Sequence, residues 1–312
     1  LYRITPNGTV IPLGHIHDLT PACFRDMTFD SSGNLYVADG TGSRILKIFP
    51  NNTFNVLVHG FMSSALAVGP SGDVFAIDTA YIRGTPPSVG ILEVSPNGTS
   101  TTFATVSGMA TDIGFDASGS LYVTIFDEGK ILKINPKGEV STFVTGLQGP
   151  SSLSFGPSGD LIVFENYTGH ILKIAPDLEV STFAKGFKIA EPWSIRFGPD
   201  LAVDSLGTVY VGIHGENNTI YKIFPNGTVT TFATGISDAG IWDCGDMTVS
   251  PRGDIFATEA APGKLYRVTQ DRITLFATGL VNDPHSITCN PSGELFIARG
   301  GSIVKISPII YV

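Results

Sequence analysis

Aspartate residues recur where short apolar segments begin, although a buried strand would normally begin with an apolar residue. The segment "DMTFDSSGNLYV" starts at Asp26, and related segments start at Asp112, Asp200 and Asp246. Carboxylates that converge on one point repel one another, and a divalent cation such as Ca²⁺, which takes roughly six to eight oxygen ligands, would relieve that repulsion. Alternatively, each carboxylate accepts hydrogen bonds from backbone N–H groups at its strand end. The residue types leave both interpretations open.

These acids belong to a repeat that predicts the fold. Seven copies of the pattern start near residues 26, 65, 112, 152, 200, 246 and 286, and a second strand pair such as "TIYKIFPNGTVTTFA" follows each copy. Four short strands that repeat every 39 to 48 residues are typical of propeller blades. No segment shows the 3.6-residue periodicity of a helix. We expect an all-β single domain over residues 1–312, a seven-bladed β-propeller of four-stranded antiparallel blades.

One strand is left over at the N-terminus. Eight segments resemble the third strand of a blade, beginning with "LYRI" at Leu1, against seven first strands. We expect residues 1–25 to form a closing hairpin and loop, in which "TVIPLG" supplies the rim strand of the last blade and residues 1–4 add an extra edge strand. Alternatively, the surplus edge pairs with another molecule, which would give self-association through the N-terminal strand.

The strand order predicts two faces. The starts of the first strands and the loops between second and third strands share one face, the loop face, whereas the "SSG" and "PNG" turns share the opposite turn face. Loops on a rigid scaffold are where binding residues concentrate. The tryptophans of the loop face either stack on a sugar or another flat ligand, or anchor their loops. Candidate residues for a small-molecule or glycan ligand are Glu165, Trp193, His214, Trp242 and Glu259.

Asn-x-Thr sequons point to the extracellular space or the cell surface. Six are present, at Asn7, Asn51, Asn97, Asn166, Asn217 and Asn226. Turn chemistry explains the three in Pro-Asn-Gly-Thr, but not the other three. The chain starts at Leu1 rather than Met, and a removed secretory signal would fit this start. We therefore expect a secreted, N-glycosylated protein.

Composition excludes two partner classes and adds little from cysteine. The net charge is −9, and the basic residues are spread singly, which argues against a nucleic-acid phosphate backbone. No apolar run approaches the roughly 18 residues that span a bilayer. The three cysteines have no metal-ligand spacing; Cys23 and Cys244 could face one another, but a disulfide is not the favoured interpretation.

The repeats resemble those of NHL, SMP-30/gluconolactonase and streptogramin-lyase-like propellers. "DSSGNLYVADGTGSRILKI" has the NHL pattern, and "GDLIVFENYTGHILKIAPD" is similar to a streptogramin-lyase repeat. The lactonase resemblance implies a metal held by Glu, Asn and Asp, but only the Asp can be carried over to the first-strand positions. The lyase resemblance implies a His and a Glu. His285 matches the His, whereas Arg299 stands at the Glu position and cannot act as a general base.

We therefore expect a secreted, N-glycosylated propeller that works as a binding or self-assembling module. The alternative is a metal-dependent lactonase-like hydrolase, in which His285 is the catalytic base and the metal polarises a carbonyl and activates water. Its candidate ligands for a divalent cation such as Ca²⁺ are Asp26, Asp112, Asp200 and Asp246. A streptogramin-lyase-like enzyme is a further, weaker alternative.

Overall fold

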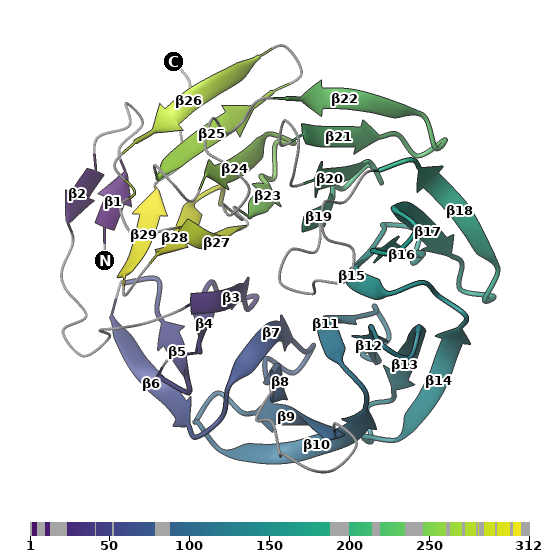
Figure 1. Cartoon of the computed structure of the whole chain (residues 1–312). Coiled ribbons are helices and arrows are strands. Elements are labelled where there is room, and N and C mark those ends of the chain that lie inside the picture. The colour runs from purple at the N-terminus through teal and green to yellow at the C-terminus, as the bar shows by residue number, and fades with distance from the viewer. Residues whose placement is uncertain are drawn as a thin grey trace.

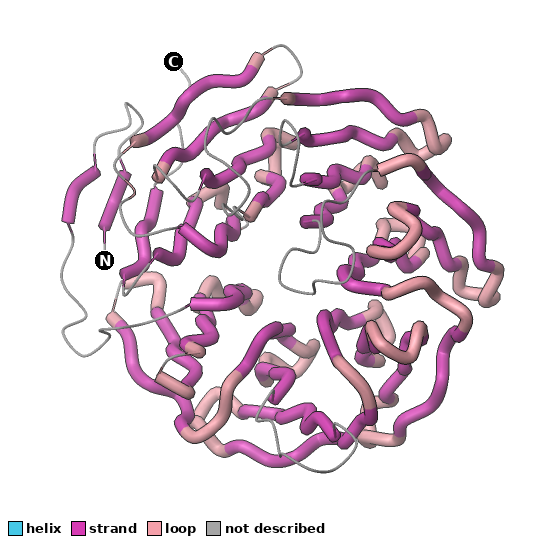
Figure 2. Tube along the Cα trace, in the orientation of Figure 1, coloured by secondary structure: helices cyan, strands magenta, loops and turns pink. Residues whose placement is uncertain are grey.

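Short strands arranged in a ring around a central axis make up the protein in the computed structural model (Figure 1). Every regular element in the described part of the chain is a β-strand (Figure 2). No helix in the described part of the chain has the length and apolar character that crossing a membrane requires. The structure describes residues 2–4, 10–12, 24–40, 42–51, 53–78, 88–187, 200–213, 219–234, 246–259, 263–269, 272–278, 280, 284–290, 292–299 and 302–306.

Six sheets are four-stranded antiparallel blades, each with its first strand near the axis and its fourth at the rim (Figure 1). Blade 1 contains β3 (Phe24–Phe29), β4 (Leu35–Asp39), β5 (Arg44–Ile48) and β6 (Phe54–His59). Blade 2 contains β7 (Ser63–Val68), β8 (Val74–Asp78), β9 (Ser88–Val94) and β10 (Ser100–Ser107). Blade 3 contains β11 (Ala110–Phe115), β12 (Leu121–Ile125), β13 (Lys130–Ile134) and β14 (Val140–Thr145).

The remaining three blades follow the same order. Blade 4 contains β15 (Pro150–Phe155), β16 (Leu161–Glu165), β17 (His170–Ile174) and β18 (Val180–Lys185). Blade 5 contains β19 (Asp200–Val203), β20 (Val209–Ile213), β21 (Thr219–Ile223) and β22 (Val229–Ala233). Blade 6 contains β23 (Met247–Val249), β24 (Ile255–Glu259), β25 (Lys264–Val268) and β26 (Ile273–Ala277).

The sheet that completes the ring differs from these blades, and the prediction of seven four-stranded antiparallel blades is wrong. This closing sheet has five strands in the order β2-β1-β29-β28-β27, and β1 runs parallel to β29. Its strands are β27 (Pro284–Cys289), β28 (Leu295–Arg299), β29 (Ser302–Ile306), β1 (Tyr2–Ile4) and β2 (Val10–Pro12).

The physical reason is that β1 and β29 both correspond to the third strand of a blade, and third strands have the same direction in every sheet. Placed side by side, two such strands are parallel, with Tyr2 opposite Val304 and Ile4 opposite Ile306. The hairpin partner β2 then pairs antiparallel with β1 on the far side. The expected order was therefore wrong as well: "TVIPLG" does not pair with β29, because β1 lies between them.

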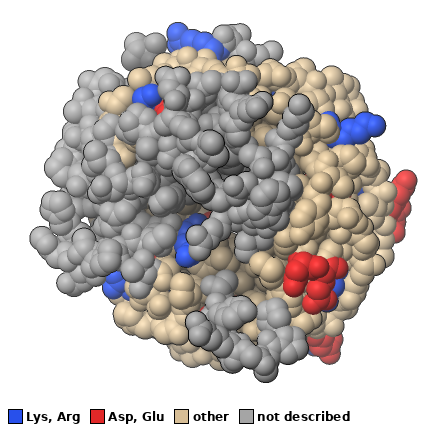
Figure 3. Space-filling model, viewed as in Figure 1, with Lys and Arg blue, Asp and Glu red and all other residues tan. Residues whose placement is uncertain are grey.

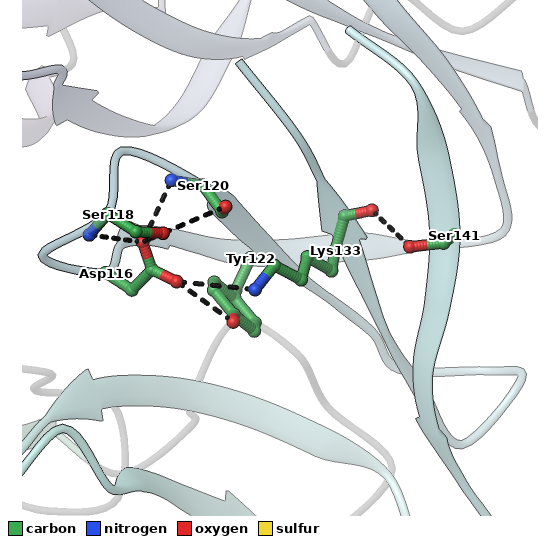
Figure 4. Close-up of polar contacts among 6 residues, drawn as sticks. All are labelled: Asp116, Ser118, Ser120, Tyr122, Lys133 and Ser141. Carbon is green, nitrogen blue, oxygen red and sulfur yellow. Dashed lines mark hydrogen bonds and ion pairs between the residues drawn. The ribbon is translucent and has the colours of Figure 1, made fainter. Parts of the chain in front are cut away.

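In blades 1, 3 and 5, the second acid of the repeat fixes the tight turn. In blade 3, Asp116 Oδ1 accepts hydrogen bonds from the amides of Ser118 and Ser120, each at 2.9 Å (Figure 4). Asp116 Oδ2 accepts a bond of 3.1 Å from the Tyr122 hydroxyl, and Lys133 Nζ lies 3.5 Å away (Figure 4). A short acceptor at this position fixes the turn and links it to the next two strands.

Apolar side chains pack between neighbouring sheets. Phe75 of blade 2, for example, makes edge-to-face contacts with Phe103 of the same blade and Phe115 of blade 3, at centroid distances of 5.0 and 4.9 Å. Successive side chains of a strand point to opposite sides of its sheet, so each sheet packs against both neighbouring sheets. The ring therefore contains a continuous series of apolar cores between sheets. On the face shown in Figure 3, Lys and Arg form separate spots, some of them beside Asp or Glu.

Candidate functional site

The first-strand aspartates join neighbouring sheets through backbone hydrogen bonds. Asp26 Oδ2 accepts a bond of 2.6 Å from the amide of Leu66 on the next blade, while its Oδ1 accepts the Met27 amide at 2.7 Å. Asp112 bonds to the amides of Leu153 and Ile113 in the same way, both at 2.8 Å. The side chain thus bridges two blades.

Asp246 repeats this arrangement. Its Oδ2 accepts the Ile287 amide at 2.9 Å, and its Oδ1 accepts the Met247 amide at 2.7 Å. In all three cases the next first strand carries a residue without a carboxylate at its own first position, so the following amide is available to the preceding blade. Those three residues are Ala65, Ser152 and Ser286. The alternation of acid and small residue therefore has a structural role.

Burial raises the pKa of two of these acids, Asp26 and Asp112, towards neutral pH. Desolvation is the main cause that raises the pKa of Asp26 to about 6 and the pKa of Asp112 to about 7. Hydrogen bonds from backbone amides oppose the shift in both residues, and the charge of Asp26 adds to it at Asp112.

Three of the four candidate cation ligands use both carboxylate oxygens for hydrogen bonds. In Asp26, Asp112 and Asp246, Oδ1 accepts the amide of the next residue and Oδ2 accepts an amide from the first strand of the next sheet. Within the described ranges, no three His, Cys, Asp or Glu side chains lie close enough together to hold a metal ion. A cation needs several free oxygens that converge, and these side chains point along the ring instead.

The acids at the ends of second strands β4 and β16 also form hydrogen bonds or ion pairs that hold nearby turns. Asp39 accepts the Gly42 amide and pairs with Arg44 Nε, both at 2.9 Å. Glu165 accepts the Gln148 amide at 2.8 Å and the Thr168 hydroxyl at 2.7 Å.

Glu259 is satisfied on one side only. Its Oε2 accepts the Tyr266 hydroxyl at 2.8 Å and lies 3.3 Å from Lys264 Nζ, whereas Oε1 is buried and has no hydrogen-bond partner among the described residues. Because Oε1 has no solvent access, a ligand cannot reach it in this conformation.

Several predicted site residues lie where no geometry can be assigned to them. Trp193, His214 and Trp242 fall outside the described residues. The backbones of Asp200 and His285 are in β19 and β27, but their side chains lie outside the description. A shared ligand site among the loop-face candidates therefore stays a prediction.

A cavity of about 750 Å³ lies on the opposite, turn face. It is formed where the first strands of blades 1, 5 and 6 and of the closing sheet end, and by the turns that follow them. Phe29, Val203, Val249 and Cys289 contribute from the strand ends. Burial raises the pKa of the Cys289 thiol to about 12, so this side chain is neutral and behaves as a small apolar group.

The turns at this cavity depart from the repeat at one position. Five of the seven turns carry serine before their glycine, and in four of them the hydroxyl bonds to a nearby side chain: Asp73, Asp116, Asp160 and Asn290. Blades 5 and 6 carry Leu206 and Arg252 instead, and both line the cavity. The Leu206 side chain is 78% exposed.

Sequence reasoning missed these two residues because it searched the loop face. The signal was present in the repeat alignment: a turn position that is otherwise serine holds an apolar and a cationic residue on adjacent blades. The alignment could not show that both residues border one cavity, because that depends on how the ring closes.

Comparison with known proteins shows the fold. No protein-family model matches the sequence, and no curated protein matches it in sequence. Among solved structures, a virginiamycin B lyase from Staphylococcus aureus in complex with quinupristin has a TM-score of 0.74 at 16% identity, covering 93% of this chain and 96% of that one. A gluconolactonase from Xanthomonas campestris has a TM-score of 0.54 at 16% identity, covering 82% and 91%.

An extracellular domain is also similar. The extracellular domain of a putative hybrid two-component system from B. thetaiotaomicron has a TM-score of 0.64 at 14% identity, covering 93% of this chain and 41% of that one. At these identities the likeness concerns architecture and not activity. The resemblance expected from the repeats is thus confirmed for the fold: the chain has the β-propeller fold of streptogramin lyases and gluconolactonases.

Proposed function

We propose that the protein is a secreted binding module whose ligand site is the cavity on the turn face. The observation that carries this proposal is Leu206, an apolar side chain left 78% exposed at the cavity, at a position where five of the seven turns have serine. A cavity of about 750 Å³ is in the usual size range of small-molecule sites. Fold neighbours that are extracellular domains support the location weakly.

The turn itself does not need leucine. The Asp204 carboxylate still accepts the amides of Leu206 and Thr208, at 2.9 and 2.8 Å, so the backbone geometry matches that of the serine-containing turns. Exposing an apolar side chain has no benefit for folding, since water disfavours apolar surface. A contact with a ligand would account for the leucine.

The chemistry of the cavity suggests the ligand class. Apolar groups from Phe29, Val203, Val249 and Leu206 line it together with Arg252. The carboxylates of Asp30 and Asp204 also line it and accept amides within their own turns. Apolar walls with a few polar groups are typical of sites for small organic molecules, in which the polar groups fix the orientation. We propose a small organic ligand with an apolar part and a hydrogen-bond acceptor or anionic group.

The test uses anilinonaphthalene sulfonate, a fluorescent probe that combines these two properties. We expect saturable binding by the folded wild-type protein and at least a tenfold weaker affinity for Leu206→Ser, because the substitution restores the common turn residue and removes the apolar contact. The matched control is Leu178→Ser, an exposed leucine on a blade 4 turn away from the cavity. Equal binding by wild type and Leu206→Ser, or no binding by wild type, would refute the proposal.

The metal-dependent lactonase-like hydrolase has less support. Its fold neighbours include a gluconolactonase, but three of its four candidate ligands use both oxygens to bridge blades. No described residue supplies the Glu and Asn that the lactonase resemblance requires at the first-strand positions. The lyase-like alternative lacks the Glu, because Arg299 occupies that position.

A further inference from the structure

We infer that Asn51, Asn97 and Asn226 carry N-linked glycans and that Asn166 does not. The inference rests on the secretion part of the proposed function, and it separates sequons that are identical as motifs. Asn7 and Asn217 lie outside the described residues.

The three favoured sequons lie in exposed turns between third and fourth strands. In each, the asparagine Oδ1 accepts the amide of the threonine two residues later at 3.0 Å, which closes a turn around the side chain. At Asn51, the Thr53 hydroxyl also donates to Oδ1 at 2.6 Å. All three asparagines are exposed, and no hydrogen bond from their Nδ2 is present among the described residues. Nδ2 therefore faces solvent with room for a glycan.

Asn166 differs in burial and in the partners of its side chain and of its sequon threonine. Its side chain is 1% exposed, and its Oδ1 accepts the Ser151 hydroxyl at 2.7 Å inside the protein. The hydroxyl of its sequon partner Thr168 donates to Glu165 instead, at 2.7 Å. A branched oligosaccharide cannot occupy this buried position, so a chain that receives a glycan at Asn166 cannot complete this fold.

The modification is an ordinary group transfer. The Asn Nδ2 forms a bond to the anomeric carbon of a lipid-diphosphate-linked oligosaccharide, and the bond between that carbon and the diphosphate oxygen breaks. The lipid diphosphate leaves, and one amide proton is released. Transfer precedes folding in the secretory pathway, so the fold selects which glycosylated chains mature.

The three glycans would lie at the rim of the turn face, on blades 1, 2 and 5. The turns after first and third strands share this face: Gly33, in the turn after β3, lies against Pro50, in the turn after β5. The equivalent turns of blades 3 and 4 have Lys137 and Asp177 at the asparagine position and no sequon. This arrangement leaves the turn-face cavity, and the rim at blades 3 and 4, without a glycan.

The experiment expresses the full chain behind a secretory signal in eukaryotic cells and maps the secreted protein by peptide mass spectrometry after deglycosylation in heavy-oxygen water. We expect labelled Asp at positions 51, 97 and 226 and unlabelled Asn at 166. Thr53→Ala, Thr99→Ala and Thr228→Ala should each remove one glycan, whereas Thr168→Ala should remove none. Occupancy of Asn166 in the secreted protein, or unmodified Asn at the three exposed sites, would overturn the inference. Probe binding by unglycosylated protein from bacteria tests the proposed function separately, so either claim can fail alone.

Discussion

The Asp26 carboxylate accepts the Leu66 amide at 2.6 Å across 40 positions of sequence, and thereby ties the inner strand of one blade to that of the next. The same bond from Asp112 to Leu153 and from Asp246 to Ile287 makes this a repeated device. Its acceptor is a partly buried carboxyl group, and without it two backbone amides would lose their hydrogen-bond partner.

Removing the acceptor should weaken the ring. We expect Asp112→Ala to lower the free energy of unfolding by about 1–3 kcal/mol, because the amides of Ile113 and Leu153 lose their partner. Urea unfolding near pH 5, followed by fluorescence, measures this. The control Asp177→Ala removes an exposed acid with one bond of 3.3 Å and should have little effect. Equal stability of the two variants would mean that the bridge contributes nothing.

The raised pKa values of Asp26 and Asp112 predict that the folded protein becomes less stable as the pH rises. In the folded protein the pKa of Asp26 is about 6 and that of Asp112 is about 7, whereas an unperturbed Asp has a pKa of 3.8. The folded protein therefore binds these protons more tightly than the unfolded chain. The stability contribution is complete below about pH 4 and is lost as the pH rises through about 6 to 7. Asp116, whose pKa is lowered by its hydrogen bonds and Lys133 despite burial, changes stability only in more acidic solution.

Thermal unfolding at a series of pH values measures this effect. We expect a lower midpoint near pH 8 than near pH 5, and a flatter profile for Asp112→Asn, in which the group cannot ionise. A wild-type midpoint that rises over this range would show that the hydrogen bonds outweigh burial.

Glycine at the end of a second-strand turn is required by a close backbone approach. Gly169 has a φ of 62°, and a Cβ there would collide with the carbonyl oxygen of Phe187. Gly186 has a φ of 93° but no atom near its Cβ position. We expect Gly186→Ala to cost about 1 kcal/mol from backbone strain and Gly169→Ala to cost several times more, as measured by urea unfolding. Similar losses for both variants would contradict the steric argument.

The N-terminal hairpin should protect the closing sheet. Deletion of residues 1–13 exposes the edge of β29 (Ser302–Ile306), whose outer neighbour is β1. We expect the truncated chain to have a lower thermal midpoint and to associate with rising concentration, because an open strand edge pairs with other chains. Light scattering coupled to gel filtration should show one chain for the full-length protein. A full-length dimer would instead favour self-association through this hairpin.

The local repeat determined most of the architecture. The spacing of "SSGNLYV"-type segments, the alternation of apolar residues and the Gly- and Asn-containing turns specify strands and hairpins through contacts only a few residues apart. They predicted the position of each first strand and the backbone bonds of the axial acids as one of two alternatives.

Only the tertiary structure decided how the ring closes, which amides the acids bind and which turns border the cavity. Strand β1 lies parallel to β29 because two segments from opposite ends of the chain meet, a relationship that no local pattern specifies. Asp26 binds an amide 40 residues away and Leu206 borders a cavity shared by distant turns, so both roles depend on which blades are neighbours. The same separation explains Asn166: its motif permits a glycan, but packing against Ser151 removes the space for one.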